Sequence, residues 1–511
     1  MIEKGLFGDL PQQVAAKREA APGAPRMWEP ERDTIELRAS SLDSLIGGDH
    51  PARLIWTYVS RLDLRELEVR IKAREGVAGH PAITPRLLLA LWLYATSEGV
   101  VSARLLSRLC GRDDVYRWLC GGLVVNHRTL GEFRVDHGEF LNRLLAESVT
   151  ALAAEGLIDL DMLSQDGVRV RAAAGASSFR RRGRLEERVA AVKALLAELA
   201  KEVDGDPSAN EERLRKRRAQ RAAERLSRLE AAVAKVAEIE AQRSKSKPQA
   251  ADEPVVPPAS GEDGEPSEPK GSKAPRKAVR ASMTDPDARV IKMADGGFRP
   301  AYNMQIASVA GEQIVVAVEV STSSSDRGLA RPMLEKIAAT YGESPNEHLV
   351  DGGFSKNDDI EWAHGAGVAM FCPPIINKHN TDPFAPREDD GPGISAWRKR
   401  MQGEAGKATY RKRSIHECIN ARLRQWGLVQ LTVRGRANAL VVITWYALVN
   451  NILQGQRLDG RPRLPEPRAV ALRRPSRQPV PRSTMQFIAA LPPQRKQPQN
   501  RSTNFEKSHT L

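Results

Sequence analysis

The chain has 511 residues, of which 41% are hydrophobic, so it is long enough for several domains and apolar enough to bury a sizeable core. Its 78 Lys and Arg residues exceed its 64 Asp and Glu residues, and the net charge of +14 favours a polyanionic partner such as nucleic acid. The four cysteines form no CxxC pair, which argues against a zinc ribbon and a disulfide framework. The longest apolar run, from Ala439, is shorter than the about 20 residues of a membrane span, so we expect a soluble protein without a membrane partner.

Residues 1–39 are a polar lead, and residues 40–155 have the pattern of successive short helices. Segments such as "HPARLIWTYVSRL" and "PRLLLALWLYATSEG" carry apolar residues at intervals of three and four, the period of an amphipathic helix. Basic side chains gather in the later helices, at Arg104, Arg108, Arg112, His127, Arg128 and Arg134. We predict a helical DNA-binding domain that holds phosphates; the alternative is a helical packing domain with an ordinary charged face.

A strand is predicted next, in "LDMLSQDGVRVR", where Leu160, Met162, Val168 and Val170 occupy alternate positions and Asp166 shares their face. Residues 175–246 then carry apolar side chains at heptad-like steps, which predicts a helical hairpin or coiled coil. Residues 247–282 are rich in Pro, Ser, Glu and Lys without periodicity, which is typical of a flexible linker. Both segments interrupt the fold that begins near Leu160.

Strand patterns resume at "AYNMQIASVAGEQIVVAVEVST", where two runs flank "AGEQ" and predict a hairpin. A helix in "LARPMLEKIAATYG", a strand in "NEHLVDGGFSK" that ends at Asp351, and a buried strand in "VAMFCPP" follow. Helices in "YRKRSIHECINARLRQWG" and "RANALVVITWYALVNNIL" complete an α/β unit over residues 156–455. Residues 456–511 are rich in Pro and Arg and are predicted to be a basic disordered tail.

Three acids of this unit form one candidate site: Asp166 on the first strand, Asp351 at the end of a later strand, and Glu417 on the helix after the last strand. A glycine follows each Asp, which lets a phosphate or another backbone come close. Carboxylates are the hard oxygen ligands that Mg²⁺ takes. Two such ions about 4 Å apart can activate water or a 3′-hydroxyl for phosphodiester cleavage. Either Asp alone is equally a cap or turn residue, so the prediction rests on the set.

Basic and phenolic side chains accompany the third acid. Tyr410, Arg413, Glu417 and Arg424 are separated by three, four and seven residues. In one α-helix, at 100° per residue, the four lie within about 60° of one another. We therefore predict that Glu417 grips a metal while Arg413 and Arg424 hold DNA phosphates. The alternative is an ordinary ion pair between Arg413 and Glu417 at i, i+4.

Other polar residues are weaker candidates. Asn303 and Gln305 share a face of the hairpin and are expected to support the acids. Asp326 is expected to cap a helix rather than bind a metal. His364 and His416 lack the spacing of zinc ligands.

These motifs resemble the DDE transposases of bacterial insertion sequences, in the group with the signature Y-(2)-R-(3)-E-(6)-K around the third acid. Here the signature is formed by Tyr410, Arg413 and Glu417, and Arg424 stands in place of the lysine. "LSQDGVRVRA" resembles the first-Asp region and "HLVDGGFSK" the second. "HPARLIWTYVSRLD" through "NHRTLGEFRVDHGEF" resembles the helical N-terminal domain of such transposases. The resemblance spans roughly Ser40 to Gln454.

The resemblance implies a catalytic core of ribonuclease H-like fold, a mixed sheet flanked by helices, interrupted by the helical insertion. By it, Asp166, Asp351 and Glu417 bind two Mg²⁺ ions, for which Mn²⁺ can substitute, and Tyr410, Arg413 and Arg424 contact DNA phosphates. The protein would bind terminal inverted repeats, cleave the element ends and join them to target DNA, as a homodimer on double-stranded DNA. It would be cytoplasmic and associated with the nucleoid. Two alternatives stay open: a metal-dependent nuclease that does not join, and a domesticated DNA-binding relative without catalysis.

Overall fold

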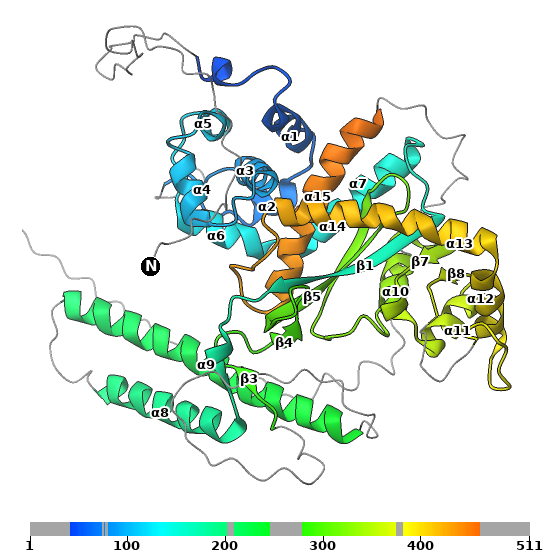
Figure 1. Ribbon diagram of the computed structural model, residues 1–511. Coiled ribbons are helices and arrows are strands. Elements are labelled where there is room, and N and C mark those ends of the chain that lie inside the picture. Colours follow the sequence, from blue (N-terminus) through cyan, green and yellow to red (C-terminus); the bar gives the residue numbers. More distant parts are fainter. Residues whose placement is uncertain are drawn as a thin grey trace, which may run out of the picture.

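The computed structural model describes residues 41–73, 76, 80–201, 209–245, 278–374 and 382–459. The predicted polar lead, most of the predicted linker and nearly all of the predicted tail lie outside these residues. A group of helices at the N-terminal end, a mixed sheet with its own helices, and a long helical hairpin are arranged side by side (Figure 1). Among the described helices, none combines the length and the apolar character that a membrane span needs.

Short helices joined by tight turns make up the N-terminal part. They are η1 (Leu42–Leu45), α1 (Pro51–Ser60), α2 (Arg65–Val69), α3 (Pro85–Ser97), α4 (Ala103–Leu109), α5 (Asp114–Cys120), α6 (His127–Asp136) and α7 (Gly138–Ala154). Several begin at a residue whose side chain accepts the first free backbone N–H groups. Ser102 caps α4, Asp113 caps α5 and Asn126 caps α6.

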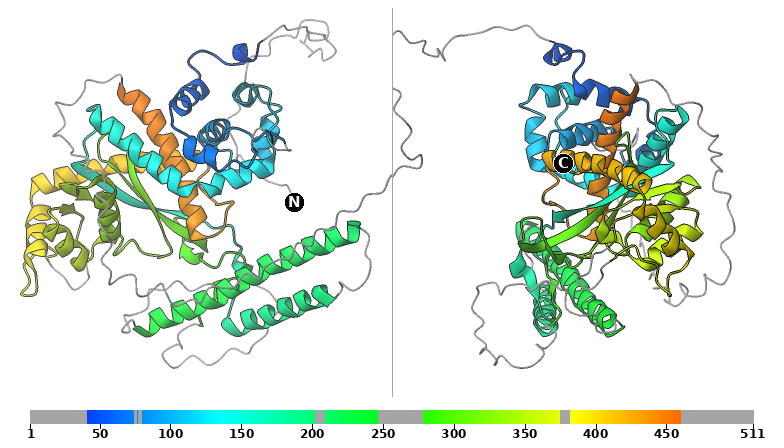
Figure 2. Two further views of the ribbon diagram at one scale, coloured as in Figure 1. Left: turned by 180° about the vertical axis from the view of Figure 1, so that it is seen from behind. Right: turned by 45° about the vertical axis from the view of Figure 1, so that its right-hand side comes forward.

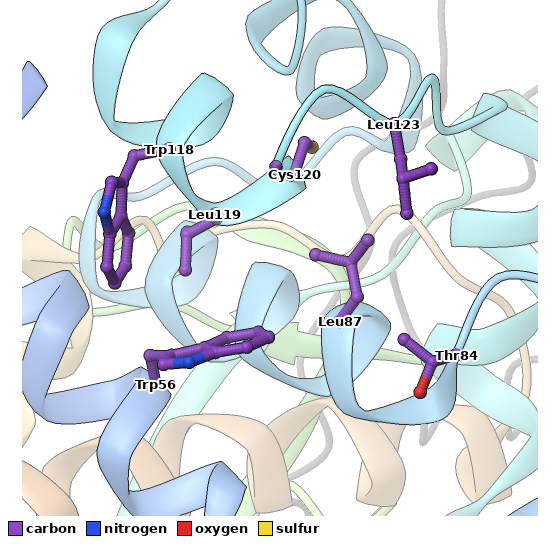
Figure 3. A pocket seen from close by; sticks show the side chains of 8 residues that line it. Trp56, Thr84, Leu87, Trp118, Leu119, Cys120 and Leu123 are labelled. Carbon is purple, nitrogen blue, oxygen red and sulfur yellow. The ribbon is translucent and has the colours of Figure 1, made fainter. Parts of the chain in front are cut away.

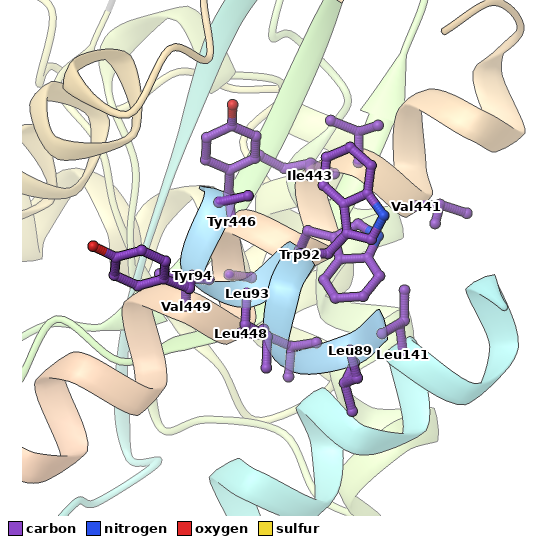
Figure 4. Close-up of a cluster of buried hydrophobic side chains, with 14 of the residues drawn as sticks. Leu89, Trp92, Leu93, Tyr94, Leu141, Val441, Ile443, Tyr446, Leu448 and Val449 are labelled. Atoms are coloured by element: carbon purple, nitrogen blue, oxygen red, sulfur yellow. The ribbon is translucent and has the colours of Figure 1, made fainter. Parts of the chain in front are cut away.

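Helix α3 lies at the centre of this part and is buried on nearly all sides, from Leu87 to Thr96. An apolar surface all round a helix requires neighbours on every side. These are α1, α5 and α6 from the same part and the long C-terminal helix α15 (Arg436–Asp459). Figure 4 shows side chains of α3 and α15 packed together, with Leu141 of α7 beside them. The N-terminal helices therefore share one core with α15 and are not a separately closed domain.

Arg134 was predicted to belong to a phosphate-binding surface, but it belongs to this core. The residue is 5% exposed, and its guanidinium lies over the ring of Trp92, 4.6 Å from the ring centroid. It donates to the backbone carbonyl of Val101 and to Oγ1 of Thr432. Burial lowers the pKa of Arg134 to about 10. In contrast, Arg104, Arg108, Arg112, His127 and Arg128 are exposed.

The sheet is built around β1 (Met162–Arg171). Its other strands are β4 (Arg289–Lys292), β5 (Phe298–Val309), β6 (Val315–Ser321), β7 (Glu347–Leu349) and β8 (Ala369–Phe371). The order is β6–β5–β1–β7–β8, and β4 pairs with the start of β5. Strand β5 is antiparallel to both β1 and β6, whereas β1, β7 and β8 are parallel. The sheet is therefore mixed, with β1 at the boundary between its antiparallel and parallel halves.

Helices cover both faces of the sheet. They are α10 (Ala330–Tyr341), α11 (Asn357–Gly365), α12 (Pro392–Gln402), α13 (Glu404–Arg411) and α14 (Ile415–Gln425), with short 3₁₀ turns η4 (Gly352–Phe354) and η5 (Lys412–Ser414). Val168 and Ile306 of the sheet share a core with Ile419 of α14 and with α15. On the other face, Leu163 and Ala307 pack with α10. Helix α12 lies in a segment whose polar sequence predicted no helix.

The insertion consists of α8 (Arg182–Lys201) and α9 (Ala209–Lys245), which lie outside the layers of the sheet in all three views (Figures 1 and 2). The two helices pack through Leu185 and Val192 of α8 and through Ala222, Leu229 and Val236 of α9, which stand seven residues apart. A short ladder of β2 (Phe179–Arg180) and β3 (Ala281–Ser282) closes the base. The predicted linker therefore ends before Ala281, because this residue pairs with Arg180.

Candidate active site on β1 and after β7

Asp166 is held on β1 by neighbours on two elements. Its Oδ1 accepts the N–H of Gly167 at 2.8 Å, and its Oδ2 accepts Nδ2 of Asn420, on α14, at 2.8 Å. The side chain is 18% exposed. Asn420 stands three residues after Glu417 and so shares a side of α14 with it. Sequence reasoning missed Asn420, although that spacing was a usable signal.

Asp351 comes level with Asp166 through the register of two parallel strands. Ser164 of β1 pairs with Leu349 of β7. The same offset, continued by two residues, places Asp351 beside Asp166 on a neighbouring strand, and neighbouring strands lie about 4.8 Å apart. The Asp351 side chain also caps the 3₁₀ turn after β7, because its Oδ1 accepts the N–H of Gly353 at 2.8 Å. Asp351 thus has the turn-residue role that was the alternative reading, and it also lies next to Asp166.

The guanidinium of Arg413 lies between acids of the set. Nη1 is 3.7 Å from Oδ2 of Asp166, and Nη2 is 3.9 Å from Oε1 of Glu417. The Arg413 side chain is 15% exposed, whereas that of Glu417 is 72% exposed. Burial lowers the pKa of Arg413, but Asp166, Tyr410 and Asp351 together raise it above its ordinary value. The guanidinium of Arg413 therefore neutralises carboxylates within the site and is not exposed to a phosphate, contrary to the prediction.

Tyr410, Arg413 and Glu417 do not lie on one regular helix as predicted. Tyr410 belongs to α13, Arg413 to the 3₁₀ turn η5, and Glu417 to α14. The tighter turn changes the phase between the two helices. Tyr410 is half-buried against the core around β7 and β8. Arg424 remains on α14, seven residues after Glu417, and both side chains are exposed.

Asp326 lies on the opposite face of β1 and does not cap a helix. Its Oδ1 accepts Nδ2 of Asn303 and Nε2 of Gln305, each at 2.7 Å. Helix α10 begins after Leu329 without a side-chain cap. The helix-cap prediction was therefore wrong, and the two amides predicted to support the acids hold Asp326 instead. The negative charge of Asp326 contributes to raising the pKa of Asp166, because the two carboxylates repel each other across the strand.

Gly167 leaves the space that Asp326 fills. A Cβ at this position would lie 2.4 Å from Oδ1 of Asp326 and 2.6 Å from Nε2 of Gln305. We expect Gly167→Ala to displace Asp326 and lower the free energy of unfolding by about 1–3 kcal/mol, as overpacking does. Chemical denaturation measures this change. Gly183→Ala is the control, because a Cβ there meets nothing within 4 Å. A Gly167→Ala variant as stable as the parent protein would contradict this packing.

Burial raises the pKa of Asp166 from 3.8 to about 6. The Gly167 N–H and Arg413 lower it, while Asp351 and Asp326 raise it further. A carboxylate pushed upward by burial and by like charges is typical of a site that holds a cation or moves a proton. The other reading, a purely structural ion pair with Arg413, would by itself lower the pKa.

The donors around Asp166 are of the kind that a divalent cation takes. They are the carboxylates of Asp166, Asp351 and Glu417 and the amide oxygen of Asn420, which is buried without a hydrogen-bond partner among the described residues. The spacing is less favourable. Over the described ranges, no three His, Cys, Asp or Glu side chains are grouped closely enough to hold a metal ion. The residues thus fit Mg²⁺ in kind, while the guanidinium of Arg413 lies between two of the carboxylates that would hold the cation.

A cavity of about 380 Å³ lies elsewhere, among the N-terminal helices. Trp56, Leu87, Trp118 and Leu123 line it, and their side chains face it from several elements (Figure 3). Its lining holds no carboxylate. This apolar cavity therefore has no part in the chemistry of the acids.

Residues 40–136 match a protein family described as Transposase domain (DUF772). The matched segment runs from just before η1 to the end of α6 and supports a transposase family for the chain. No curated protein and no solved structure matches the chain. The sheet and its acids lie outside the matched segment.

Proposed function

We propose that the chain is a DDE transposase of an insertion sequence, which binds the terminal inverted repeats of its element and catalyses Mg²⁺-dependent DNA cleavage and strand transfer. One observation supports the chemistry above others: the parallel register of β1 and β7, continued by two residues, brings Asp351 level with Asp166, and α14, which carries Glu417, packs against β1. The transposase-domain match of residues 40–136 supports the biological setting. The mixed sheet, with β1 between its two halves, supports a ribonuclease H-like core.

Asp166, Asp351 and Glu417 would hold the cations, Mg²⁺ or Mn²⁺, and Asn420 is placed to add an amide oxygen. When bound, two such ions supply charge that stabilises the attacking and leaving oxygens of an in-line displacement at phosphorus. Arg413 has to release Asp166 and Glu417 for this grouping to form. Its ion pairs, at 3.7 and 3.9 Å, are longer than hydrogen bonds and so permit that release.

The chain's basic side chains would position DNA. Arg424 is exposed on the same side of α14 as Glu417 and is suited to a phosphate beside the reacting one. Arg413, once released from the acids, would take a second phosphate, with Tyr410 beside it. In the N-terminal part, Arg104 and Arg108 are exposed on α4, and phosphate contacts there would fix the register on the inverted repeat. Because two ends must be brought together, we expect a homodimer on DNA.

The test is a cleavage and joining assay with duplexes taken from the DNA that flanks the coding sequence. With Mg²⁺ or Mn²⁺, the protein is expected to nick the element ends and to join the exposed 3′-hydroxyl to a second duplex. Removal of divalent cations with EDTA should stop both reactions while end binding persists, because the N-terminal helices do not use the cation.

The outcomes separate the alternatives. Cleavage without any joined product would indicate a metal-dependent nuclease, and end binding without cleavage would indicate a domesticated relative. Cleavage that continues at the full rate in EDTA would overturn the two-cation proposal.

A further inference from the structure

The helical insertion carries a strongly basic surface that the chemistry of the acids does not use. Between Arg213 and Arg228, α9 contains eight basic residues and one acid, Glu224. The rest of α9 contains Glu211 and Glu212 before this stretch and, from Leu229 to Lys245, three basic and three acidic residues. The excess charge is thus confined to the first half of the helix.

The charges of the second half are paired within the hairpin. Lys193 lies 2.9 Å from Glu230, and Arg182 lies 3.6 Å from Glu240. Lys235 lies 2.6 Å from Glu238. Such a balanced mixture is sufficient for a helix face that only has to be solvated. Solvation alone therefore does not explain the excess of positive charge in the first half of α9.

The arginines of the first half form a stripe. Arg213, Arg217, Arg221 and Arg225 stand four residues apart and are exposed. Within the part of the chain that the structure describes, none of the four has an ion-pair partner. At 1.5 Å per residue, they follow one another about every 6 Å over about 18 Å, and each is turned by about 40° from the last. Within the stretch from Arg213 to Arg228 the one acid, Glu224, accepts a hydrogen bond from Gln220 at 3.2 Å, and just before the stretch Glu212 lies 2.6 Å from Lys216.

This stretch also lies outside the packed part of the hairpin. The ion pairs of Arg182 with Glu240 and of Lys193 with Glu230 set an antiparallel register that brings the end of α8, Lys201, opposite Ala222. Ala222 is also the first residue of α9 in the buried cluster between the helices. The described residues of α9 before it add nothing to that cluster, and Leu214 is 49% exposed. Among the residues that the structure describes, most of the basic stripe therefore lies beyond the end of α8 and outside the buried cluster between the two helices.

We propose that this stripe, which lies within residues 213–228 of α9, is a second binding surface for the phosphate backbone of double-stranded DNA. The inference rests on the proposed function and adds a partner surface to it. Duplex DNA carries one negative charge about every 1.7 Å along its axis, so a row of guanidinium groups over about 18 Å meets several phosphates at once. Such contacts hold the duplex without reading its sequence. The insertion would thus clamp DNA that the N-terminal helices select.

The experiment compares two triple variants of the full chain that remove the same charge. Arg217→Gln, Arg221→Gln and Arg225→Gln remove the stripe, whereas Arg182→Gln, Lys193→Gln and Lys235→Gln remove paired charges of the same hairpin. Binding to a duplex of unrelated sequence is measured by fluorescence anisotropy between 50 and 300 mM salt. We expect the stripe variant to bind roughly 10- to 100-fold more weakly and its salt slope to fall by about 2 to 3, since each phosphate contact contributes about 0.9. The paired-charge variant is expected to bind within about twofold of the parent protein.

A third variant, Arg217→Lys with Arg221→Lys and Arg225→Lys, keeps the charge and should restore most of the binding, with circular dichroism confirming intact helices. Equal binding and equal slope for the stripe variant would overturn this inference and leave the proposed function intact. Failure of the parent protein to bind any duplex would overturn both. A preference for duplex RNA over DNA, lost in the stripe variant, would show that the surface belongs to another nucleic acid and overturn the DNA assignment.

Discussion

Asp166→Asn, Asp351→Asn and Glu417→Gln are each expected to lower the rate of end cleavage in Mg²⁺ by roughly 10³-fold or more while end binding stays unchanged. Charge stabilisation by a bound cation is worth several kcal/mol, and each 1.36 kcal/mol corresponds to a factor of ten in rate. An amide keeps the size of the side chain but removes the negative charge that holds the cation. Single-turnover cleavage of labelled end duplexes measures the rate, and anisotropy measures end binding.

The stability of Asp166→Asn separates loss of chemistry from loss of folding. Asp166 has a pKa of about 6 in the folded protein and an ordinary value of 3.8. Its stabilising contribution is complete below pH 3.8 and is lost as the pH rises through 6, so its ionised form costs about 3 kcal/mol at most at pH 7. We therefore expect the amide to raise the free energy of unfolding by about 1–2 kcal/mol in EDTA. The buried Oδ1 of Asn420 is available to accept the new N–H after a flip of its amide.

Asp159→Asn is the matched control, because this acid lies exposed just before β1. Its cleavage rate and stability should equal those of the parent protein. If all three variants of the set cut normally, the acids do not carry the reaction. If Asp166→Asn loses both activity and stability, its loss of activity reports misfolding instead.

The strands, and the alignment of Asp166 with Asp351 across two of them, could be predicted from the local sequence pattern. Alternating residues predicted β1, and two β-branched runs around "AGEQ" predicted the hairpin of β5 and β6. Asp351 follows a short strand, and a parallel neighbour of β1 places its end beside Asp166. The positions of Asp166 and Asp351 could therefore be anticipated, because a strand fixes the direction of each side chain.

The break between α13 and α14 left no such signal. "KRS" contains neither Pro nor Gly, so the helical period runs through it without interruption. We attribute its 3₁₀ geometry to tertiary packing, because Ile419 and Leu423 of the following helix α14 are buried in the core around β1. Tertiary packing commonly overrides local preference. The predicted helix face was wrong for that reason.

Contacts between distant segments were also beyond the sequence. Asn420 lies 254 residues after Asp166, and Asp326 finds its partners on a strand more than 20 residues earlier. By residue type Arg134 resembles its exposed basic neighbours, but its contacts with the ring of Trp92, the carbonyl of Val101 and Oγ1 of Thr432 bury it. A single sequence shows residue types along a helix or strand, but it does not show which faces meet.

Acidification is expected to destabilise the protein through two buried histidines near the same acids. His348, on β7, bonds Oε1 of Gln165 at 3.0 Å, and His416, on α14, bonds Oγ of Ser308 at 2.9 Å. Burial lowers the pKa of His348 to about 3. Burial also lowers the pKa of His416 to about 3, and the charges of Arg413 and His348 contribute. Both imidazoles are therefore neutral in the folded protein at pH values where they are protonated in the unfolded chain.

The direction and size of the effect follow from this difference. A base whose pKa is lowered on folding adds stability that is complete above its ordinary pKa of 6.5 and is lost as the pH falls toward 3. At pH 4.5, the loss is about 2.7 kcal/mol for each histidine. Protonation of Asp166 offsets about 2 kcal/mol of it between pH 7 and pH 4.5. We expect a net loss of about 3 kcal/mol in EDTA, which is a large share of the 5–15 kcal/mol of a typical domain.

His348→Gln and His416→Asn test the assignment, because each amide can keep one hydrogen bond and cannot be protonated. Either substitution costs some stability at pH 7 through imperfect packing, so the informative quantity is the difference in unfolding free energy between pH 7 and pH 4.5. That difference should shrink by about 2–3 kcal/mol in each variant and stay unchanged in His127→Gln, whose side chain is exposed at the start of α6. The two histidines sit on β7 and α14, the elements that bring Asp351 and Glu417 toward Asp166. Their protonation therefore loosens the same contacts that assemble the acids, whereas cleavage should already fall at a higher pH, as Asp166 with its pKa of about 6 takes up a proton.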